Sequence, residues 1–271
     1  MPFTRHHLQV ALGLLWLLDG VLQAQPFMFT RDFATQVIAP AAQGQPGFVS
    51  DPVHWASTVI AAHPGPWNAL FAAVQLLLGV GLLIPRTVRP ALAASIVWGL
   101  GVWYFGEALG GLAGGDATLA TGAPGAALLL AVLAAAAWPH GDRPREGPAS
   151  WLPLAWALVW IGAAPLQALP QNGGTALVVA EYLIGVGALA RTTRAPAAAL
   201  GLALALGIWI VSQDAGRLFS GQATDPNSEA VLALMAIALL RPRIPQASEL
   251  RRAWPRRRAP APLHAESRGR A

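Results

Sequence analysis

The sequence contains no cysteine and no lysine, and it has few charged residues of any kind. Of its 271 residues only 11% are charged, whereas a soluble domain carries about 25%. The absence of cysteine excludes disulfides, thiolate metal sites and thiol redox chemistry within the chain. All 18 basic residues are arginine, which we interpret as genome composition. Because 55% of the residues are hydrophobic, we expect that most of the surface does not face water.

The net charge of +5 is compatible with nucleic-acid binding, but its distribution argues against it. Nine of the 18 arginines lie between Arg241 and Arg270, in an Arg- and Pro-rich stretch. We predict that residues 242–271 form a disordered cytoplasmic tail. Attraction to anionic lipid at about 1 kcal/mol per arginine explains such a tail. Membrane lipid, and not nucleic acid, is therefore the expected partner.

A segment of 44 residues occurs twice, which indicates a tandem duplication. Gln75–Thr118 aligns without a gap on Glu181–Thr224, 106 residues later, and 17 of the 44 positions are identical. Several identities are Gly, Pro or Trp, which a shared apolar composition does not place in register. The repeat extends backwards at an offset of 144 residues through Trp16/Trp160, Gln23/Gln167 and Pro26/Pro170. Two equivalent halves are therefore expected.

Eight apolar runs, four in each half, predict an all-α polytopic membrane protein. Crossing about 30 Å of hydrocarbon takes about 20 helical residues at 1.5 Å each. The runs are Leu8–Ala24, Trp67–Ile84, Ala91–Leu109, Gly122–Trp138, Trp151–Leu169, Thr175–Ala190, Pro196–Gln213 and Asn227–Leu240. The first run also resembles a signal peptide, but its counterpart in the second half is internal. We therefore expect it to be retained as a transmembrane helix.

These runs divide the chain into four parts. Residues 1–139 form the first four-helix repeat, 140–150 a cytoplasmic hinge and 151–241 the second four-helix repeat, followed by the tail. The first repeat contains an outer insertion, residues 25–66. Within it, Ser50-Asp51-Pro52 predicts the start of an amphipathic helix that ends at His63. A helical projection places Ala56, Val59, Ile60 and His63 on one side, and His54, Ser57 and Ala61 on another.

The placement of arginine predicts the orientation in the membrane. With both termini in the cytoplasm, 16 of the 18 arginines lie inside, and only Arg31 and Arg217 lie outside. Each half has an even number of helices, so both halves enter the membrane from the same side. The two repeats are then parallel and related by a pseudo-twofold axis along the membrane normal. We expect a multi-pass protein of the cytoplasmic (inner) membrane.

Polar residues within the runs gather in the predicted outer half of the bilayer. An ionisable residue at mid-membrane costs roughly 2.5–3.5 kcal/mol on insertion scales, so such residues need a reason. One hypothesis is that they line an outward-facing polar cavity near the interface of the halves. The alternative is that each one hydrogen-bonds across neighbouring helices. The candidate residues are Asp19, Gln23, Gln75, Trp103, Glu107, Gln167, Glu181, Trp209, Gln213, Asp214 and His63.

The histidines and the glycine-rich turns carry weaker signals. His63 is a candidate ligand or proton carrier, although a histidine at a helix C-terminus is favoured by the helix dipole alone. No histidine lies within a predicted span, which argues against a haem held between two helices. The turns at 110–116 and 216–221 fit helix ends better than anion-binding nests. We predict no metal site and assign no catalytic residue.

Each half resembles the DoxX-like four-helix membrane proteins. The likeness is carried by the pattern Gln/Glu-x-x-x-Gly-x-Gly-x-Leu at Gln75–Leu83 and Glu181–Leu189, each followed by an Arg-containing turn. It covers about 160 residues over both halves. This group includes the membrane subunit of thiosulfate:quinone oxidoreductase. The resemblance implies quinone-linked redox work beside a soluble partner, with no covalently bound cofactor. The tandem arrangement departs from the family's single unit, and a basic residue near Asp19 is absent.

Three functions are therefore open. A redox-associated membrane subunit would bind a quinone ring in an apolar slot with a few hydrogen-bonding groups. A proton-coupled small-molecule transporter would use the parallel repeats and the embedded carboxylates. A scaffold or assembly subunit would need no ligand. Of these, the resemblance favours the quinone-linked subunit.

Overall fold

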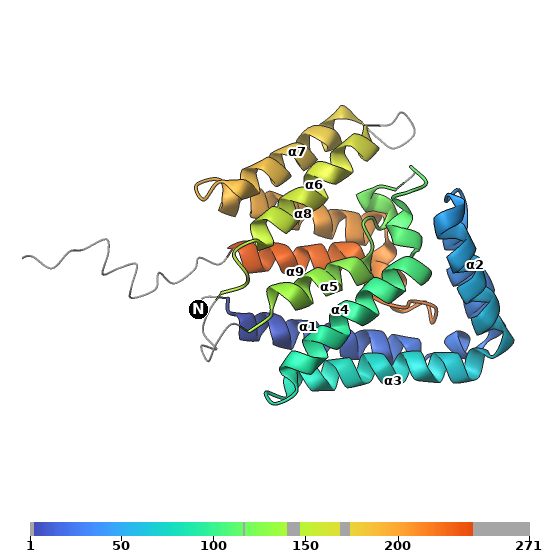
Figure 1. The fold of residues 1–271 in the computed structure, drawn as a ribbon. Coiled ribbons are helices and arrows are strands. Elements are labelled where there is room, and N and C mark those ends of the chain that lie inside the picture. Colours follow the sequence, from blue (N-terminus) through green and yellow to red (C-terminus); the bar gives the residue numbers. More distant parts are fainter. Residues whose placement is uncertain (1–2, 116, 140–146, 169–173, 241–271) are drawn as a thin grey trace, which may run out of the picture.

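The computed structural model describes residues 3–115, 117–139, 147–168 and 174–240, and the regular elements within these ranges are helices (Figure 1). The helices of the first half are α1 (Arg5–Gln23), α2 (Gly47–Ala62), α3 (Pro64–Leu83), α4 (Val88–Phe105) and α5 (Ala126–Ala136). Those of the second half are α6 (Leu152–Gln167), α7 (Thr175–Leu189), α8 (Arg194–Val211) and α9 (Ser228–Leu240). The predicted all-α class is confirmed. The predicted tail, and most of the predicted hinge, lie outside the described residues.

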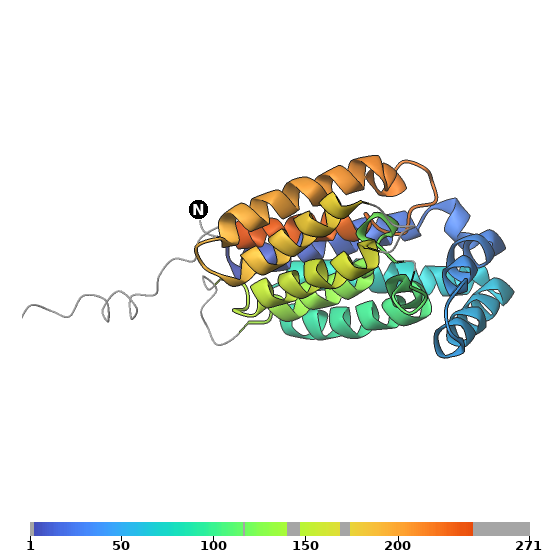
Figure 2. The ribbon, with the colours of Figure 1, turned by 90° about the horizontal axis from the view of Figure 1, so that it is seen from above.

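The short helices α5 and α9 pack against each other where the two halves meet. In Figure 1, α1, α3 and α4 lie below this pair and α6, α7 and α8 lie above it; Figure 2 looks down on the bundle, so that these layers overlap. In the first half, α1 packs on α3 and α4 packs on α5. In the second half, α6 packs on α7 and α8 packs on α9. One apolar core runs through both halves, and its largest fully buried side chains are Trp16, Trp156 and Trp160.

The two halves repeat individual hydrogen bonds as well as helices. The indole Nε1 of Trp103 donates to the Pro124 carbonyl at 2.7 Å, and Trp209 donates to the Pro226 carbonyl at 2.7 Å. The hydroxyls of Thr87 and Thr193 donate to the carbonyls of Gly81 and Gly187 at 2.8 and 2.7 Å, respectively. The sequence repeat therefore preserves specific tertiary contacts, and it gives Trp103 and Trp209 a structural role at equivalent places.

The repeated Gly-x-Gly pattern lets neighbouring helices approach closely. A Cβ at Gly79 would lie 2.6 Å from Leu17 Cγ and 2.8 Å from the Gly13 carbonyl oxygen on α1. At the equivalent Gly185, a Cβ would lie 2.6 Å from Ile161 Cγ1 on α6. Small residues at such crossings allow the backbones to pack where lipid gives helices little hydrophobic reason to associate.

Several predicted helix ends are wrong, and backbone conformation explains the largest errors. The third apolar run was predicted to stay helical to Leu109, but α4 ends at Phe105. Ala108, Leu109 and Gly110 all have positive φ, which a right-handed helix does not tolerate. The fourth run was predicted to start at Gly122, but α5 starts at Ala126 and has only 11 residues. Glycines at 122 and 125 also have positive φ.

The outer insertion is more structured than predicted. It contains short helices at Pro26–Phe29, Phe33–Ile38 and Ala39–Ala42 before α2, the second of them a π-helix. These elements form a small core of their own with α2, built on residues such as Met28 and Val49. In Figure 1 the insertion lies at the right-hand end of the bundle, with α2 across that end.

Helix α2 starts at Gly47 rather than at the predicted Ser50 cap, and Pro52 lies inside it. Proline has no N–H for the carbonyl four residues earlier, here Phe48. The hydroxyl of Tyr104 on α4 donates to that carbonyl at 2.7 Å instead. Ser57, predicted to lie away from the apolar side, is buried, and its hydroxyl donates to the Ala34 carbonyl at 2.8 Å.

Three described helices are long and apolar enough to cross a membrane: α3, α4 and α8. Helix α1 has 19 residues but is not among them. Helices α5, α6, α7 and α9 are shorter, and α5 extends only about 16 Å at 1.5 Å per residue. Exposed large apolar side chains such as Leu77, Val97 and Val211 lie on the three candidate spans. Eight complete spans with cytoplasmic termini stay a prediction.

Candidate functional site

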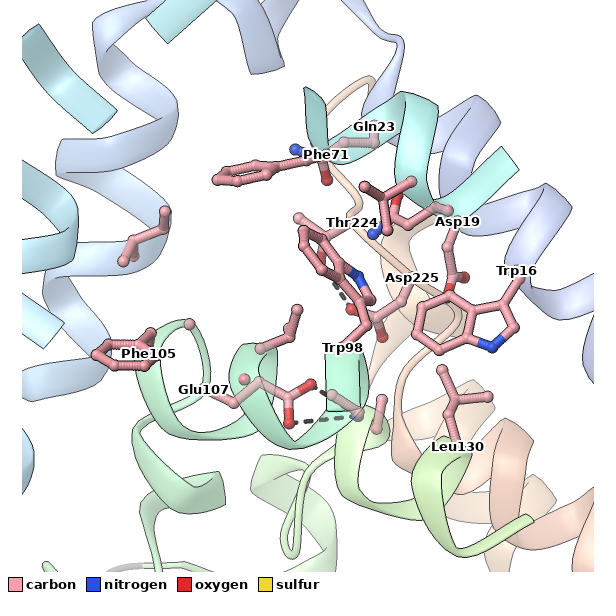
Figure 3. Close-up of a pocket in the computed structure, with 18 of the residues that line it drawn as sticks. Trp16, Asp19, Gln23, Phe71, Trp98, Phe105, Glu107, Leu130, Thr224 and Asp225 are labelled. Atoms are coloured by element: carbon pink, nitrogen blue, oxygen red, sulfur yellow. Dashed lines mark hydrogen bonds between the residues drawn. The ribbon is translucent and has the colours of Figure 1, made fainter. Parts of the chain in front are cut away.

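A cavity of about 540 Å³ lies where α1, α3, α4 and α5 meet the outer insertion and the loop before α9 (Figure 3). Most of its wall is apolar, and its aromatic lining residues are Trp16, Phe33, Phe71, Trp98 and Phe105. Its polar lining residues are Asp19, Gln23, Gln75, Glu107, Thr224 and Asp225. The volume is within the range of about 300–1,000 Å³ that small-molecule sites occupy. We call it the carboxyl cavity.

Three carboxyl groups from separate elements converge on this cavity. Asp19 comes from α1, Glu107 follows α4, and Asp225 lies in the loop before α9. Each is within electrostatic range of the other two. In Figure 3 Asp225 lies between Asp19 and Glu107. None of the described residues that line the cavity is Arg, Lys or His, so the three acids have no basic counterpart in its wall.

Glu107 is positioned by the end of one helix and the start of another. The left-handed turn after α4 directs its carboxylate to the N-terminus of α5, where it accepts the Ala127 N–H at 3.0 Å. Anionic groups are stabilised at this end of a helix by the unpaired N–H groups and the helix dipole. Gly125, with φ +106°, leaves room for the carboxylate, because a Cβ there would overlap Glu107 Oε2.

Asp225 is fixed by local hydrogen bonds. The Thr224 hydroxyl donates to Oδ2 at 2.7 Å, and the Asn227 N–H donates to Oδ1 at 2.7 Å. The second bond is an Asx turn, which explains why aspartate suits the position before Pro226. Asp225 is not among the residues predicted to line the cavity, because the local pattern Asp225-Pro226 is typical of a helix cap and gives no sign of a second role in the cavity wall.

Burial raises the pKa of Glu107 and Asp225, the two of the three carboxyls that lie outside the helices. Burial, together with the negative charge of Asp225, raises the pKa of Glu107 to about 8, although the Ala127 N–H bond acts in the opposite direction. Burial likewise raises the pKa of Asp225, although its bonds from Thr224 and Asn227 lower it. Both residues keep part of their surface open to the cavity. Glu107 therefore exchanges its proton at a higher pH than an ordinary carboxyl does.

Several buried polar atoms on the cavity wall have no hydrogen-bond partner in the described structure. They include the acceptors Asp19 Oδ1 and Gln75 Oε1 and the indole donors of Trp16 and Trp98. A buried polar atom without a partner costs about 1–3 kcal/mol. Hydrogen-bonding capacity is therefore left unused in four residues that line this cavity. The Gln23 side-chain amide donates to Asn68 Oδ1, and the Asn68 amide donates to the Gln23 carbonyl, so neither residue is a partner of Asp19.

The cavity also reaches the apolar surface of the bundle. Val97, near the middle of α4, lines the cavity and is 73% exposed. Ala94, on the same helix, also lines it and is exposed. Because α4 is a candidate membrane span, a lipid-soluble molecule could reach the carboxyls from the side.

The second half holds a matching polar group at its own last helix. Gln213, the repeat equivalent of Glu107, donates to the Glu229 carboxylate and to the Leu119 carbonyl. Glu229 occupies the place on α9 that Ala127 occupies on α5, as Pro226 matches Pro124. Both halves therefore put one carboxylate at the start of the last helix, supplied by different elements. An alignment of the two halves shows only that Gln213 replaces Glu107, and not that Glu229 supplies the carboxylate in the second half.

The predicted site residues separate into groups. Asp19, Gln23, Gln75 and Glu107 meet at the carboxyl cavity. Gln213 belongs to the Glu229 group, while Glu181 is buried on α7 and Gln167 is buried on α6. The carboxyl cavity, which the first four of these residues line, is mainly apolar. The four remaining candidates lie outside the carboxyl cavity: Trp103, Trp209, Asp214 and His63, of which the last two are exposed.

Among the described residues, no group of three or more His, Asp or Glu side chains is arranged to hold a metal ion. Comparisons with protein-family models, curated proteins and solved structures find no match to the chain. The resemblance to DoxX-like proteins therefore stays a prediction that rests on the repeated Gly-x-Gly pattern.

Proposed function

We propose that this protein is a proton-coupled transporter of small lipophilic organic cations. The observation that carries the proposal is the convergence of Asp19, Glu107 and Asp225 on one mainly apolar cavity that has no basic residue in its described wall. Carboxylates in such surroundings need either protons or a cation to offset their charge. A bound organic cation would provide that charge and fill the apolar space.

The aromatic wall favours the same ligand class. Trp16, Trp98 and Phe71 line the cavity beside the acids, as Figure 3 shows. The face of an aromatic ring attracts a cation by about 0.5–2 kcal/mol, most strongly for tryptophan. The unpartnered Oδ1 of Asp19 adds a hydrogen-bond acceptor. A planar aromatic cation would therefore be held by charge, ring faces and apolar contact together.

Coupling to protons follows from the raised pKa of Glu107, about 8. At neutral pH this carboxyl is mostly protonated in the empty cavity. A bound cation stabilises the ionised form, so that the proton leaves as the cation enters. By linkage, raising the pH must strengthen cation binding to the same extent that the cation promotes proton release. Exchange of a cation for a proton is the elementary step of an antiporter.

The proposal includes the membrane orientation. Both termini are placed in the cytoplasm, with eight helices of the bundle embedded in the cytoplasmic membrane and the carboxyl cavity nearer the outer surface. Reporter fusions should then place residues 30–60 outside. A fusion at Ala271 should report inside, and the reverse pattern at either point would contradict the orientation.

Ethidium, a planar aromatic monocation, is the probe for transport. Proteoliposomes with an imposed pH gradient should accumulate ethidium on the acidic side, where cations are exchanged for outgoing protons. Asp19→Asn should abolish this accumulation. Asp214→Asn, which removes an exposed carboxyl outside the cavity, is the matched control and should transport normally. Equal accumulation by both variants would contradict the proposal.

A second candidate function is the quinone-linked membrane subunit implied by the DoxX-like resemblance. The indole N–H groups of Trp16 and Trp98 support it, because both lack acceptors and could bond quinone carbonyls. Solvent extraction of the purified protein decides between the two. A stoichiometric quinone would favour this candidate, and its absence together with absent ethidium binding would favour a scaffold.

A further inference from the structure

A second cavity, of about 350 Å³, adjoins the carboxyl cavity at the outer end of the bundle. Its lining includes Gln36, Arg217, Ser220 and Gln222, all of which are exposed at the surface. We call it the polar cavity. Unlike the carboxyl cavity, it is lined largely by polar side chains and opens among residues that face water.

The two cavities share part of their walls. Val37, Thr224 and Asp225 line both of them. Val37 lies on the π-helix of the insertion, and the other two residues lie in the loop before α9. These three residues are therefore the partition between a water-facing space and an apolar one. The Asp225 carboxylate lies in that partition, and Asp19 and Glu107 lie on its apolar side.

We propose that the polar cavity is the aqueous entrance to the carboxyl cavity, and that Asp225 is the group through which protons pass between them. The aqueous entrance does not depend on which ligand the protein binds. The role of Asp225 in passing protons, which we call the relay role, rests on the proposed transport function. A hydronium ion in the polar cavity gives its proton to the Asp225 carboxylate and is left as water. That proton then passes to Glu107 or Asp19, and it returns along the same path when a cation binds.

The groups around Asp225 suit this role. On the apolar side it faces the carboxyls of Asp19 and Glu107, and on the polar side the cavity wall contains Arg217. The bonds from Thr224 and Asn227 hold both carboxylate oxygens in the partition. A fixed carboxyl between water and two other acids can pass a proton without a large movement of the chain. The lipophilic ligand has a separate approach, at the exposed side of α4.

The absence of cysteine makes the path directly testable. Single cysteines at Ser220, Thr224 and Val97 sample the water-facing rim, the partition and the lipid-facing rim. Each variant is placed in lipid nanodiscs and treated with a charged trimethylammonium methanethiosulfonate reagent. Ser220→Cys and Thr224→Cys should be labelled, and Val97→Cys should be labelled at least tenfold more slowly. Failure of Thr224→Cys to react, with or without reaction at Ser220→Cys, overturns the path.

The relay role is tested on the same Thr224→Cys protein before and after labelling. The attached charged group should slow proton release on addition of ethidium at least tenfold, because it fills the partition beside Asp225. Unchanged release kinetics after complete labelling overturn the relay. If ethidium does not bind at all, the transport proposal fails, and the labelling pattern still decides whether the polar cavity is the entrance.

Discussion

Replacing Glu107 with glutamine should remove part of the pH dependence of this protein's stability. The pKa of Glu107 rises from its ordinary value of 4.5 to about 8 in the folded protein. Between these values the unfolded chain ionises this carboxyl, while the folded chain keeps it protonated. The free energy of unfolding therefore falls as pH rises through this window and stays low above it. At about 1.4 kcal/mol per pH unit, the total loss has an upper limit of about 5 kcal/mol.

The measured loss should be smaller than this limit, because Glu107 keeps part of its surface open to the cavity. A glutamine at position 107 can still accept the Ala127 N–H. The second half has a glutamine, Gln213, at the equivalent position. Intrinsic fluorescence of the 11 tryptophans gives the apparent melting temperature in detergent. From pH 5 to 9 the wild type should lose several degrees more than Glu107→Gln, with Asp214→Asn following the wild type. Parallel curves for wild type and Glu107→Gln would refute this reasoning.

Three further variants test the packing and the site. Gly79→Ala should destabilise the fold by about 1–3 kcal/mol, because its Cβ would overlap α1; Gly207→Ala, with open space around it, is the thermal-denaturation control. Gln213→Leu should cost about 1–3 kcal/mol in the same assay by leaving the Glu229 carboxylate without its amide donor, and an unchanged melting temperature would contradict the assigned bond. Trp98→Leu should weaken ethidium binding about 3–30-fold through the lost cation–π contact. Binding of phenanthridine, the uncharged parent ring, should change much less, and equal losses in the titration would argue against a cation site.

The duplication was the part of the fold that the sequence predicted best. Glycine and tryptophan recur in register because each makes a contact that other residues cannot make, such as the close approach at Gly79 and the Trp103 bond to a carbonyl. The outer insertion was harder to predict. Its π-helix and the proline inside α2 depend on tertiary partners, among them the Tyr104 hydroxyl that bonds with the Phe48 carbonyl. The local sequence pattern does not predict such a tertiary partner.

The candidate site was predicted in part. Asp19 and Glu107 were predicted because each is a charged residue within an apolar run. Burying a carboxyl there costs free energy, so its presence indicates a function. The prediction did not include Asp225, whose local role before Pro226 already explained its presence. It also placed candidates from both halves at one cavity, whereas Gln167, Glu181 and Gln213 lie outside it, and Glu229 takes the place of Glu107 at the last helix of the second half. A residue with two roles, or a group supplied from a different element, is visible only in three dimensions.

The most direct test of the central claim counts the protons displaced by a bound cation. Isothermal titration of ethidium into the protein in nanodiscs, near pH 7.5 and in buffers of different ionisation enthalpy, gives that number. About one proton should be released per ethidium, and the Kd should fall as pH rises toward the Glu107 pKa of about 8. Both effects should be lost in Glu107→Gln but retained in Asp214→Asn. Ethidium binding with no proton release and no pH dependence would contradict the account.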